Sequence, residues 1–382
     1  MLKIGVIGIG NTGNQIAALA MEKLKVPVLA INSSEKDLET LPDGVDRQII
    51  TDENGLSQGA GKNRTLAKKY LKDTIMQFLT GEKMQKFMLD LDVCFIVSST
   101  GGGTGSGTAP MMAGIIESSY RNAKVILVGV LPVNSEALSA HVNTLEYCNE
   151  LYSALPDQTY MLYDNDSLAT LPSYQIMEKV NEEVVKDMDV IRCIHNYTTR
   201  YDSIDEEDMK RLISFPGRII VVRLEDMKEK DAEDTTIEQL LIDNLKKNCH
   251  VEIQRDRKIV ASGVITNLNK HLSDQFDNHV PLVREFIGVP VHDFNHIYIN
   301  PDRKLPNNVY LILTGLTPIN DKIHKISDRV DEIQERQRQM IEDNAMHEID
   351  VNTLAGSIEE KDVKRNEASQ VDLSDIFTKF GI

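Results

Sequence analysis

A run of glycines between two apolar segments constrains this chain more than any other feature. Residues 99–108 read STGGGTGSGT, between the apolar runs VCFIV and APMMAGII. A strand followed by such a run and then by a helix exposes successive backbone N–H groups, which form a concave site for a di- or triphosphate. Hydroxyls of Thr104 and Ser106 add donors. A flexible linker is the alternative, and the apolar flanks argue against it. No Gly-Lys-Ser/Thr follows, so this is not a Walker loop.

A second glycine loop begins the chain's first helix. Gly8, Gly10 and Gly13 fit the G-x-G-x-x-G pattern directly after an apolar strand. A dinucleotide-dependent oxidoreductase would also need an acidic residue about 20 positions on, to bind the ribose hydroxyls. The second strand instead ends Ala-Ile-Asn-Ser-Ser at residues 30–34. The oxidoreductase therefore remains only as a distant alternative.

A third loop, QGAGKNR at residues 58–64, precedes a helical pattern. Its glycines expose amides, and Lys62 or Arg64 could neutralise phosphate charge. By itself the segment is also compatible with an ordinary turn.

Short apolar runs alternate with helical patterns through the first 180 residues. Strands are expected at 3–9, 27–32, 92–98, 124–132 and 159–163, and helices at 65–79 and 108–119. Continuous apolar runs are typical of strands buried on both faces, and this alternation predicts a mostly parallel sheet covered by helices. The fold class is therefore α/β, with a Rossmann-like nucleotide-binding domain.

Later segments suggest a second α/β domain and a helical extension. A long central helix is expected over 173–200. Strands are expected at 219–224, 259–265, 294–299 and 309–313, and helices at 236–247 and 268–286. Apolar residues from Ile319 to Ile333 alternate at spacings of four and three, which indicates an amphipathic helix. The predicted organisation is 1–172 nucleotide-binding domain, 173–200 central helix, 201–318 second domain, 319–344 C-terminal helix and 345–382 flexible tail.

Composition excludes several classes of protein. The net charge of −17 disfavours direct nucleic-acid binding by the folded part. No apolar run approaches the roughly 20 residues that cross a bilayer, so no membrane association is expected. The four cysteines are far apart and form no CxxC pair, which favours a reducing cytoplasm and gives no metal-ligand set.

The three glycine loops together resemble the tubulin/FtsZ superfamily. GGGTGSG is similar to the family's phosphate loop, GNTGNQI to the first nucleotide loop of tubulin, and GAGKN to the FtsZ loop beside the γ-phosphate. They occur in the family's order, and the resemblance covers about residues 1–320. It implies a GTPase that binds GTP or GDP with Mg²⁺ and polymerises head to tail.

The resemblance also implies roles for individual residues. The α- and β-phosphates are expected on Gly101, Gly102, Gly103, Thr104, Gly105, Ser106 and Gly107. The phosphate and base side is expected to include Gly10, Asn11 and Gln15. The γ-phosphate is expected beside Gly59, Ala60, Gly61 and Asn63. Sugar-side contacts are expected from Glu136, Asn165 and Asp166, and Asn181 on the central helix is expected to read guanine.

An acidic pair follows the central helix. Asp205 and Asp208 are three residues apart at a helix start, where carboxylates also favour the helix dipole without further function. Ser203, Asp205 and Asp208 resemble the N-x-D-x-x-D motif of FtsZ, with serine in place of asparagine. That resemblance makes Asp205 and Asp208 catalytic residues that complete the nucleotide site of the next subunit and orient the attacking water. Mg²⁺ is expected to bridge the β- and γ-oxygens.

Two segments favour the TubZ branch, which segregates plasmid or phage DNA. The stretch from Pro132 to Ser139 carries Glu136 but has Ala140 where cell-division FtsZ usually has arginine. SFPG at 214–217 also resembles TubZ. In that branch the C-terminal tail recruits a DNA-bound adaptor protein. A division-ring FtsZ remains the alternative.

Overall fold

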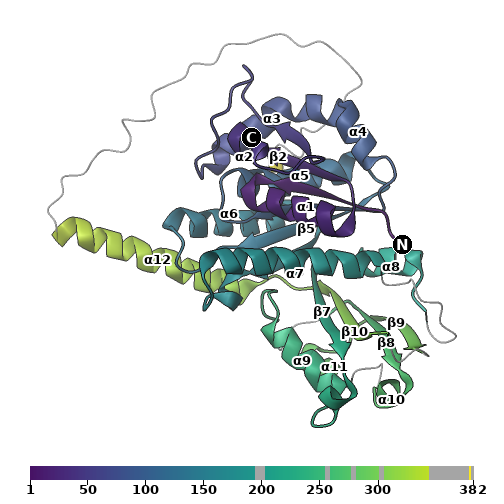
Figure 1. The fold of residues 1–382 in the computed structure, drawn as a ribbon. Coiled ribbons are helices and arrows are strands. Elements are labelled where there is room, and N and C mark those ends of the chain that lie inside the picture. Colours follow the sequence, from purple (N-terminus) through teal and green to yellow (C-terminus); the bar gives the residue numbers. More distant parts are fainter. Residues whose placement is uncertain (194–202, 254–258, 277–280, 301–304, 344–377, 380–382) are drawn as a thin grey trace.

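A computed structural model describes residues 1–193, 203–253, 259–276, 281–300, 305–343 and 378–379. Within this part of the chain, α-helices and β-strands alternate around one large sheet (Figure 1). None of the described helices has the length and apolar character needed to cross a membrane. The central helix α7 lies between the sheet's first six strands above and the later strands below in Figure 1.

The first half of the chain forms six parallel strands with helices between them. The strands are β1 (Ile4–Ile9), β2 (Val28–Asn32), β3 (Asp46–Ile49), β4 (Val93–Ser99), β5 (Lys124–Leu131) and β6 (Thr159–Asp164). The helices are α1 (Gly10–Leu24), α2 (Glu35–Glu39), α3 (Arg64–Thr80), α4 (Glu82–Met88), α5 (Thr104–Ser119) and α6 (Leu138–Ala154), followed by the 3₁₀ turn η1 (Asn165–Leu168). All residues of β1 and β2 are buried, as their continuous apolar sequences predict.

The second half continues the same sheet. Its strands are β7 (Gly217–Met227), β8 (Ala261–Asn269), β9 (His292–Asn300) and β10 (Asn307–Leu316), and the order across all ten is β3-β2-β1-β4-β5-β6-β7-β10-β8-β9. β10 runs antiparallel to both of its neighbours, so the sheet is mostly rather than wholly parallel. Only two residue pairs join β6 to β7. The α/β fold with a large parallel sheet is confirmed.

Helices of the second half are α7 (Ser173–Cys193), α8 (Glu206–Leu212), η2 (Glu229–Ala232), α9 (Ile237–Lys247), α10 (Lys270–Ser273) and α11 (Pro281–Ile287). The helix predicted over 268–286 is wrong: Leu268 belongs to β8, and two short helices follow. Leu268, Leu272 and Val283 are all buried in the cluster that includes Ile242 and Leu311. These apolar residues do face the core, but they lie on three elements, β8, α10 and α11, rather than on one helix.

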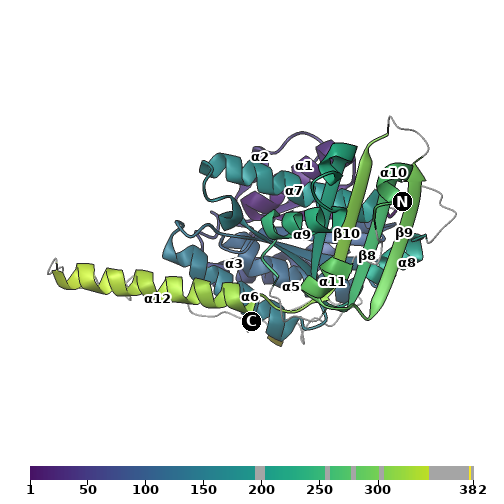
Figure 2. The ribbon, with the colours of Figure 1, turned by 90° about the horizontal axis from the view of Figure 1, so that it is seen from below.

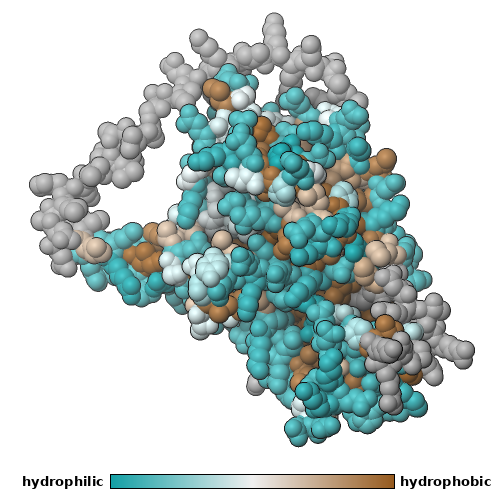
Figure 3. All heavy atoms as spheres, viewed as in Figure 1, coloured by the Kyte–Doolittle hydropathy of each residue, from teal (hydrophilic) through white to brown (hydrophobic). Residues whose placement is uncertain are grey.

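The last described helix is α12 (Asn320–Asp343), close to the predicted 319–344. Its first half packs on the body through Ile326 and the preceding Ile319, which join the core cluster of α5 and α6. Its second half projects away from the body (Figures 1 and 2). The face shown in Figure 3 is mostly hydrophilic, including much of this projecting length. The tail predicted at 345–382 lies outside the described residues, apart from 378–379.

Candidate nucleotide site

A cavity of about 470 Å³ lies where β4, β5 and β6 end. Its walls come from the end of β4 and the glycine run after it, from the end of β5 and the loop that follows, and from Asn165 after β6. The residues from the first two segments are Ser99, Gly101, Gly102, Val130, Leu131, Pro132, Val133, Ser135 and Glu136. The start of α7 closes one side. Crevices at the carboxyl ends of parallel strands are the usual ligand sites of open α/β sheets. The sheet topology therefore places a binding site at the predicted glycine run.

The glycine loops approach each other too closely for side chains. A Cβ on Gly103 would lie 2.7 Å from the Cα of Lys62, and a Cβ on Gly105 would lie 2.9 Å from the carbonyl oxygen of Ile9. Gly10 has a φ of +72° and packs against the backbone nitrogen of Gly105. Three segments far apart in the sequence thus meet backbone to backbone. Their contact requires glycine and brings the N-terminus of α5 to the cavity.

The side chains of Asn143 and Arg64 hold these loops in place. The Asn143 amide donates to the carbonyl oxygens of Lys62, Gly101 and Gly102, at 3.0, 3.2 and 3.0 Å. The buried Arg64 donates to the carbonyl oxygen of Ser106 at 2.9 Å. Arg64 also pairs with Glu146 and Glu150 of α6. A lone asparagine in an amphipathic helix carries no signal in the sequence, and Arg64 was noted only as a phosphate contact.

Five of the predicted nucleotide-binding residues line the cavity together: Gly101, Gly102, Glu136, Asn165 and Asn181. Thr12, Lys62 and Ser99 line it too. The other predicted residues are not among those that line the cavity. Gln15 donates to Asn11 at 3.3 Å on the exposed face of α1.

The remaining predicted residues have structural partners. The Asn63 side chain accepts from Leu66 N and caps α3. The Thr104 hydroxyl pairs with Ser33 at 2.7 Å, and the Ser106 hydroxyl donates to Gly102 O. The chain from Gly59 through Ala60 and Gly61 is placed by bonds from Gly59 N to Ser33 O and from Asn63 N to Ala60 O. Lys62 is the member of this loop that reaches the cavity wall.

The cavity's polar groups suit a nucleoside phosphate. Ser173, Met177 and Asn181 follow one another at spacings of four along α7, so they share the helix face that lines the cavity. Asn165 Oδ1 is buried with no hydrogen-bond partner, although a buried acceptor normally has one. A hydroxyl or amino group of a ligand would satisfy it. An unpaired acceptor on one wall and the amide-rich glycine run on another fit a sugar and its phosphates.

Asp205 and Asp208, the acidic pair, lie at the other end of the sheet's strands from the cavity. Asp205 caps α8 by accepting from Asp208 N at 2.8 Å, and Asp208 accepts from Asp205 N at 3.4 Å. Lys210 of α8 pairs at 2.9 Å with Asp92, which precedes β4, and Glu206 pairs with the N-terminus. These contacts place α8 at the amino ends of β1 and β4, whereas the cavity lies at their carboxyl ends. Within their own chain, both carboxylates cap the start of α8.

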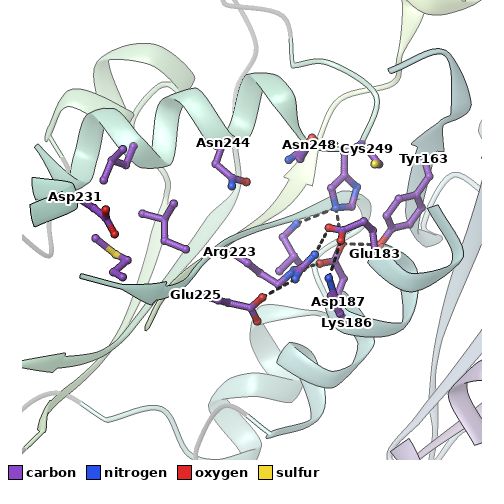
Figure 4. A pocket seen from close by; sticks show the side chains of 15 residues that line it. Tyr163, Glu183, Lys186, Asp187, Arg223, Glu225, Asp231, Asn244, Asn248 and Cys249 are labelled. Carbon is purple, nitrogen blue, oxygen red and sulfur yellow. Dashed lines mark hydrogen bonds and ion pairs between the residues drawn. The ribbon is translucent and has the colours of Figure 1, made fainter. Parts of the chain in front are cut away.

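A larger cavity, about 590 Å³, lies between α7, β7 and α9 (Figure 4). Asp187 accepts there from the Tyr163 hydroxyl at 2.8 Å and from Arg223 Nε at 2.7 Å, and its Oδ2 lies 2.9 Å from His250 Nε2. Burial, and then the negative charge of Asp187, raise the pKa of Tyr163 well above its ordinary value. None of the predicted nucleotide-binding residues lines this cavity, and its charged groups pair with one another. The smaller cavity is therefore the candidate site for a nucleoside phosphate.

Comparison with known proteins finds a family match in the first half of the chain. The model of the tubulin/FtsZ family GTPase domain matches residues 3–172. This span contains the three glycine loops and the strands that end at the cavity.

Relatives and solved structures extend the similarity beyond that domain. The tubulin-like protein TubZ of a Clostridium botulinum C phage is 22% identical over 368 residues, which cover 92% of this chain and 91% of that protein. The structure of Clostridium botulinum phage c-st TubZ, truncated at its C-terminal tail, has a TM-score of 0.70 at 21% identity, covering 87% of this chain and 98% of that one. A GTPγS-form protofilament of Bacillus thuringiensis serovar israelensis TubZ has a TM-score of 0.72 at 19% identity, covering 89% and 94%.

Proposed function

We propose, from the match of residues 3–172 to the model of the tubulin/FtsZ family GTPase domain, that the chain hydrolyses GTP between the subunits of a head-to-tail filament. One observation supports the proposal above all others. The nucleotide cavity lies at the carboxyl ends of the sheet's strands, and the acidic pair lies at their amino ends. Each therefore exposes half of a site to a different neighbouring copy of the chain.

Helix α7 sets the separation of the two halves. Ser173, Met177 and Asn181 near its start line the cavity, and its 21 residues end at Cys193. At 1.5 Å per residue this helix is about 30 Å long. α8 lies beside the far end of α7 in Figure 1. Asp205 cannot reach the cavity of its own chain, but stacking one copy on another along this axis brings the two together.

The cavity's residues bind and orient the nucleotide in this proposal. Backbone N–H groups of 101–107 and the N-terminus of α5 bind the phosphates, and Lys62 neutralises part of their charge. Asn165 accepts a hydrogen bond from the sugar, and the amide of Asn181 pairs with the polar edge of guanine. Mg²⁺ bound with the nucleotide would supply charge neutralisation on the phosphate oxygens.

Hydrolysis depends on the neighbouring copy. Phosphoryl transfer requires an oriented water and charge stabilisation more than covalent chemistry. Asp205 and Asp208 of the next subunit orient that water. Their present bonds to the amides at the start of α8 use one oxygen each, so the other carboxylate oxygens remain as acceptors.

We further propose that the filament segregates plasmid or phage DNA through a DNA-bound adaptor that binds the C-terminal tail. The TubZ relatives, aligned over nine-tenths of this chain, support this branch. The net charge of −17 also disfavours direct DNA binding, which favours an adaptor as the link to DNA. A cell-division role is the second candidate, favoured by the FtsZ protein of Buchnera aphidicola at 24% identity over 341 residues.

The shared site is tested with variants that separate capping from catalysis. Asp205→Asn retains a good helix cap but lacks the negative charge, whereas Asp205→Ala lacks both. Both variants should bind GTP normally, because Asp205 is remote from the cavity. Their GTP hydrolysis should fall roughly 10²–10⁴-fold, the usual contribution of a proton-transfer or water-orienting group.

Glu207→Gln is the matched control, since Glu207 is an exposed acid on the same helix. It should hydrolyse GTP at the parent rate. In the parent protein the rate per molecule should rise steeply with protein concentration. A rate per molecule independent of concentration, or normal hydrolysis by Asp205→Asn, contradicts the shared site and leaves Asp205 as a helix cap.

A further inference from the structure

An ion-pair cluster connects the C-terminal helix to the nucleotide cavity. Lys322, in the first turn of α12, lies 2.8 Å from Asp164 Oδ2 and 3.0 Å from Asp166 Oδ2. The three side chains are only 13%, 15% and 14% exposed. Pairs this shielded from water are screened less than surface pairs. Burial by itself would lower the pKa of Lys322, but the two carboxylates outweigh it and raise that pKa, so the amine stays charged at neutral pH.

Both carboxylates also shape the cavity wall. Asp164 Oδ1 accepts from Asp166 N at 3.1 Å and caps η1, the turn that carries Asn165. Asp166 Oδ1 accepts from Asn134 N at 2.8 Å. Asn134 lies within the loop whose neighbours Val133, Ser135 and Glu136 line the cavity. The two carboxylates together therefore fix two parts of the wall, η1 and the loop after β5.

Without a cation these acids would destabilise the wall. Asp164 and Asp166 share one ammonium group, so its removal leaves two poorly solvated carboxylates repelling each other. The simplest relief is movement of η1, which would displace Asn165 and release Asn134. The wall thus depends on α12 lying where it does.

We propose that Lys322 is a positioning residue for the nucleotide, which couples the docking of α12 to nucleotide affinity. The proposal rests on the proposed function, since it takes a guanine nucleotide as the cavity's ligand. Lys322 acts through Asp164 and Asp166 and does not line the cavity itself. Contacts that shift the projecting half of α12 would then alter nucleotide binding through this cluster.

The test compares Lys322→Met with Lys325→Met in the full chain. Lys325 lies one turn further along α12 and is exposed, with no ion pair among those described. GDP affinity is measured by titration below the concentration at which the protein assembles. We expect Lys322→Met to weaken GDP binding roughly tenfold, as one charge-assisted hydrogen bond commonly does, while Lys325→Met binds like the parent.

Two further variants separate positioning from mere attachment of the helix. Lys322→Arg keeps the charge and should recover most of the affinity. Asp164→Asn added to Lys322→Met removes the carboxylate repulsion but keeps an η1 cap, so it should also recover part of the affinity. GTP turnover at saturating nucleotide should change less than threefold in Lys322→Met, because the hydrolytic acids come from the other end of the molecule.

Normal GDP affinity in Lys322→Met, with only a lower melting temperature, overturns the inference and leaves Lys322 as an attachment point for α12. Equal losses in Lys322→Met and Lys325→Met overturn it as well. Failure of the parent protein to bind GDP or GTP would instead overturn the proposed function, and this inference with it.

Discussion

At the scale of single residues, the site depends on glycines whose missing side chains let the loops pack closely, as well as on the side chains that line the cavity. Gly103 and Gly102 are neighbours, yet their surroundings differ. A Cβ at 103 would meet the backbone of Lys62 and Asn63 at 2.7–3.0 Å, whereas a Cβ at 102 would meet only the Ser99 hydroxyl at 2.9 Å. Backbone cannot move as easily as a hydroxyl. The packing of the loops therefore requires glycine at position 103 but not at position 102.

Gly103→Ala should accordingly lower the free energy of unfolding by about 1–3 kcal/mol, the usual cost of overpacking. Gly102→Ala should lower it by less than half as much, because the Ser99 side chain can rotate away. Thermal or denaturant unfolding of the nucleotide-free proteins measures both. Equal destabilisation by the two changes would mean that the loops are not packed as described.

We propose that one residue, Asn181, also sets the base selectivity of the site. The Asn181 amide offers both a donor and an acceptor on the wall lined by the start of α7. GTP and GDP should bind much better than ATP, and Asn181→Ala should weaken GTP binding roughly 10–100-fold while barely changing ATP binding. A competition titration measures this. Equal affinity of the parent protein for ATP and GTP is the outcome that would falsify the base assignment.

At the scale of elements, sequence pattern predicted the buried strands well and the irregular segments poorly. Strands β1, β2, β4, β5 and β6 are apolar on both faces, so their runs are unmistakable. β3, with the sequence DRQI, was missed because it is a partly exposed edge strand. The three glycine loops were found, since glycine is informative where backbones approach. The bonds of Asn143 and the ion pairs of Lys322 join residues 41–158 positions apart, and no local pattern encodes them.

Helix α7 is attached to the second half of the sheet by Asp187, which is 3% exposed and pairs with Arg223 and His250. Asp187→Ala would leave the Arg223 guanidinium buried with one carboxylate fewer. Breaking a buried pair in this way usually costs about 3–5 kcal/mol of unfolding free energy. Asp189→Ala is the matched control on the same helix, because Asp189 is 43% exposed and should contribute less than about 1 kcal/mol. Similar losses in both variants would show that the cluster does not stabilise the fold.

At the scale of the whole molecule, the described body contains the cavity, the acidic pair and the helix between them. All described residues that line the cavity lie between Thr12 and Asn181, far from residues 345–382 in the sequence. Deleting them should leave GTP affinity and filament formation unchanged and abolish binding of a DNA-bound adaptor. Pelleting assays with GTP measure assembly, and binding of an adaptor–DNA complex to the pelleted filaments measures recruitment. A truncated protein that neither assembles nor binds GTP would place the tail within the fold.

The shared site that we propose, with its two halves at opposite ends of the strands of one sheet, also fixes a count. A row of n copies contains n − 1 junctions, so one nucleotide in each row always lacks the acids needed for its hydrolysis. In a pair of molecules that is half of all nucleotides, and in a row of a hundred it is one in a hundred. The nucleotide left over is always at the same extremity, the one where a cavity faces solvent. A row of identical molecules therefore has two chemically different ends before any other protein binds to it.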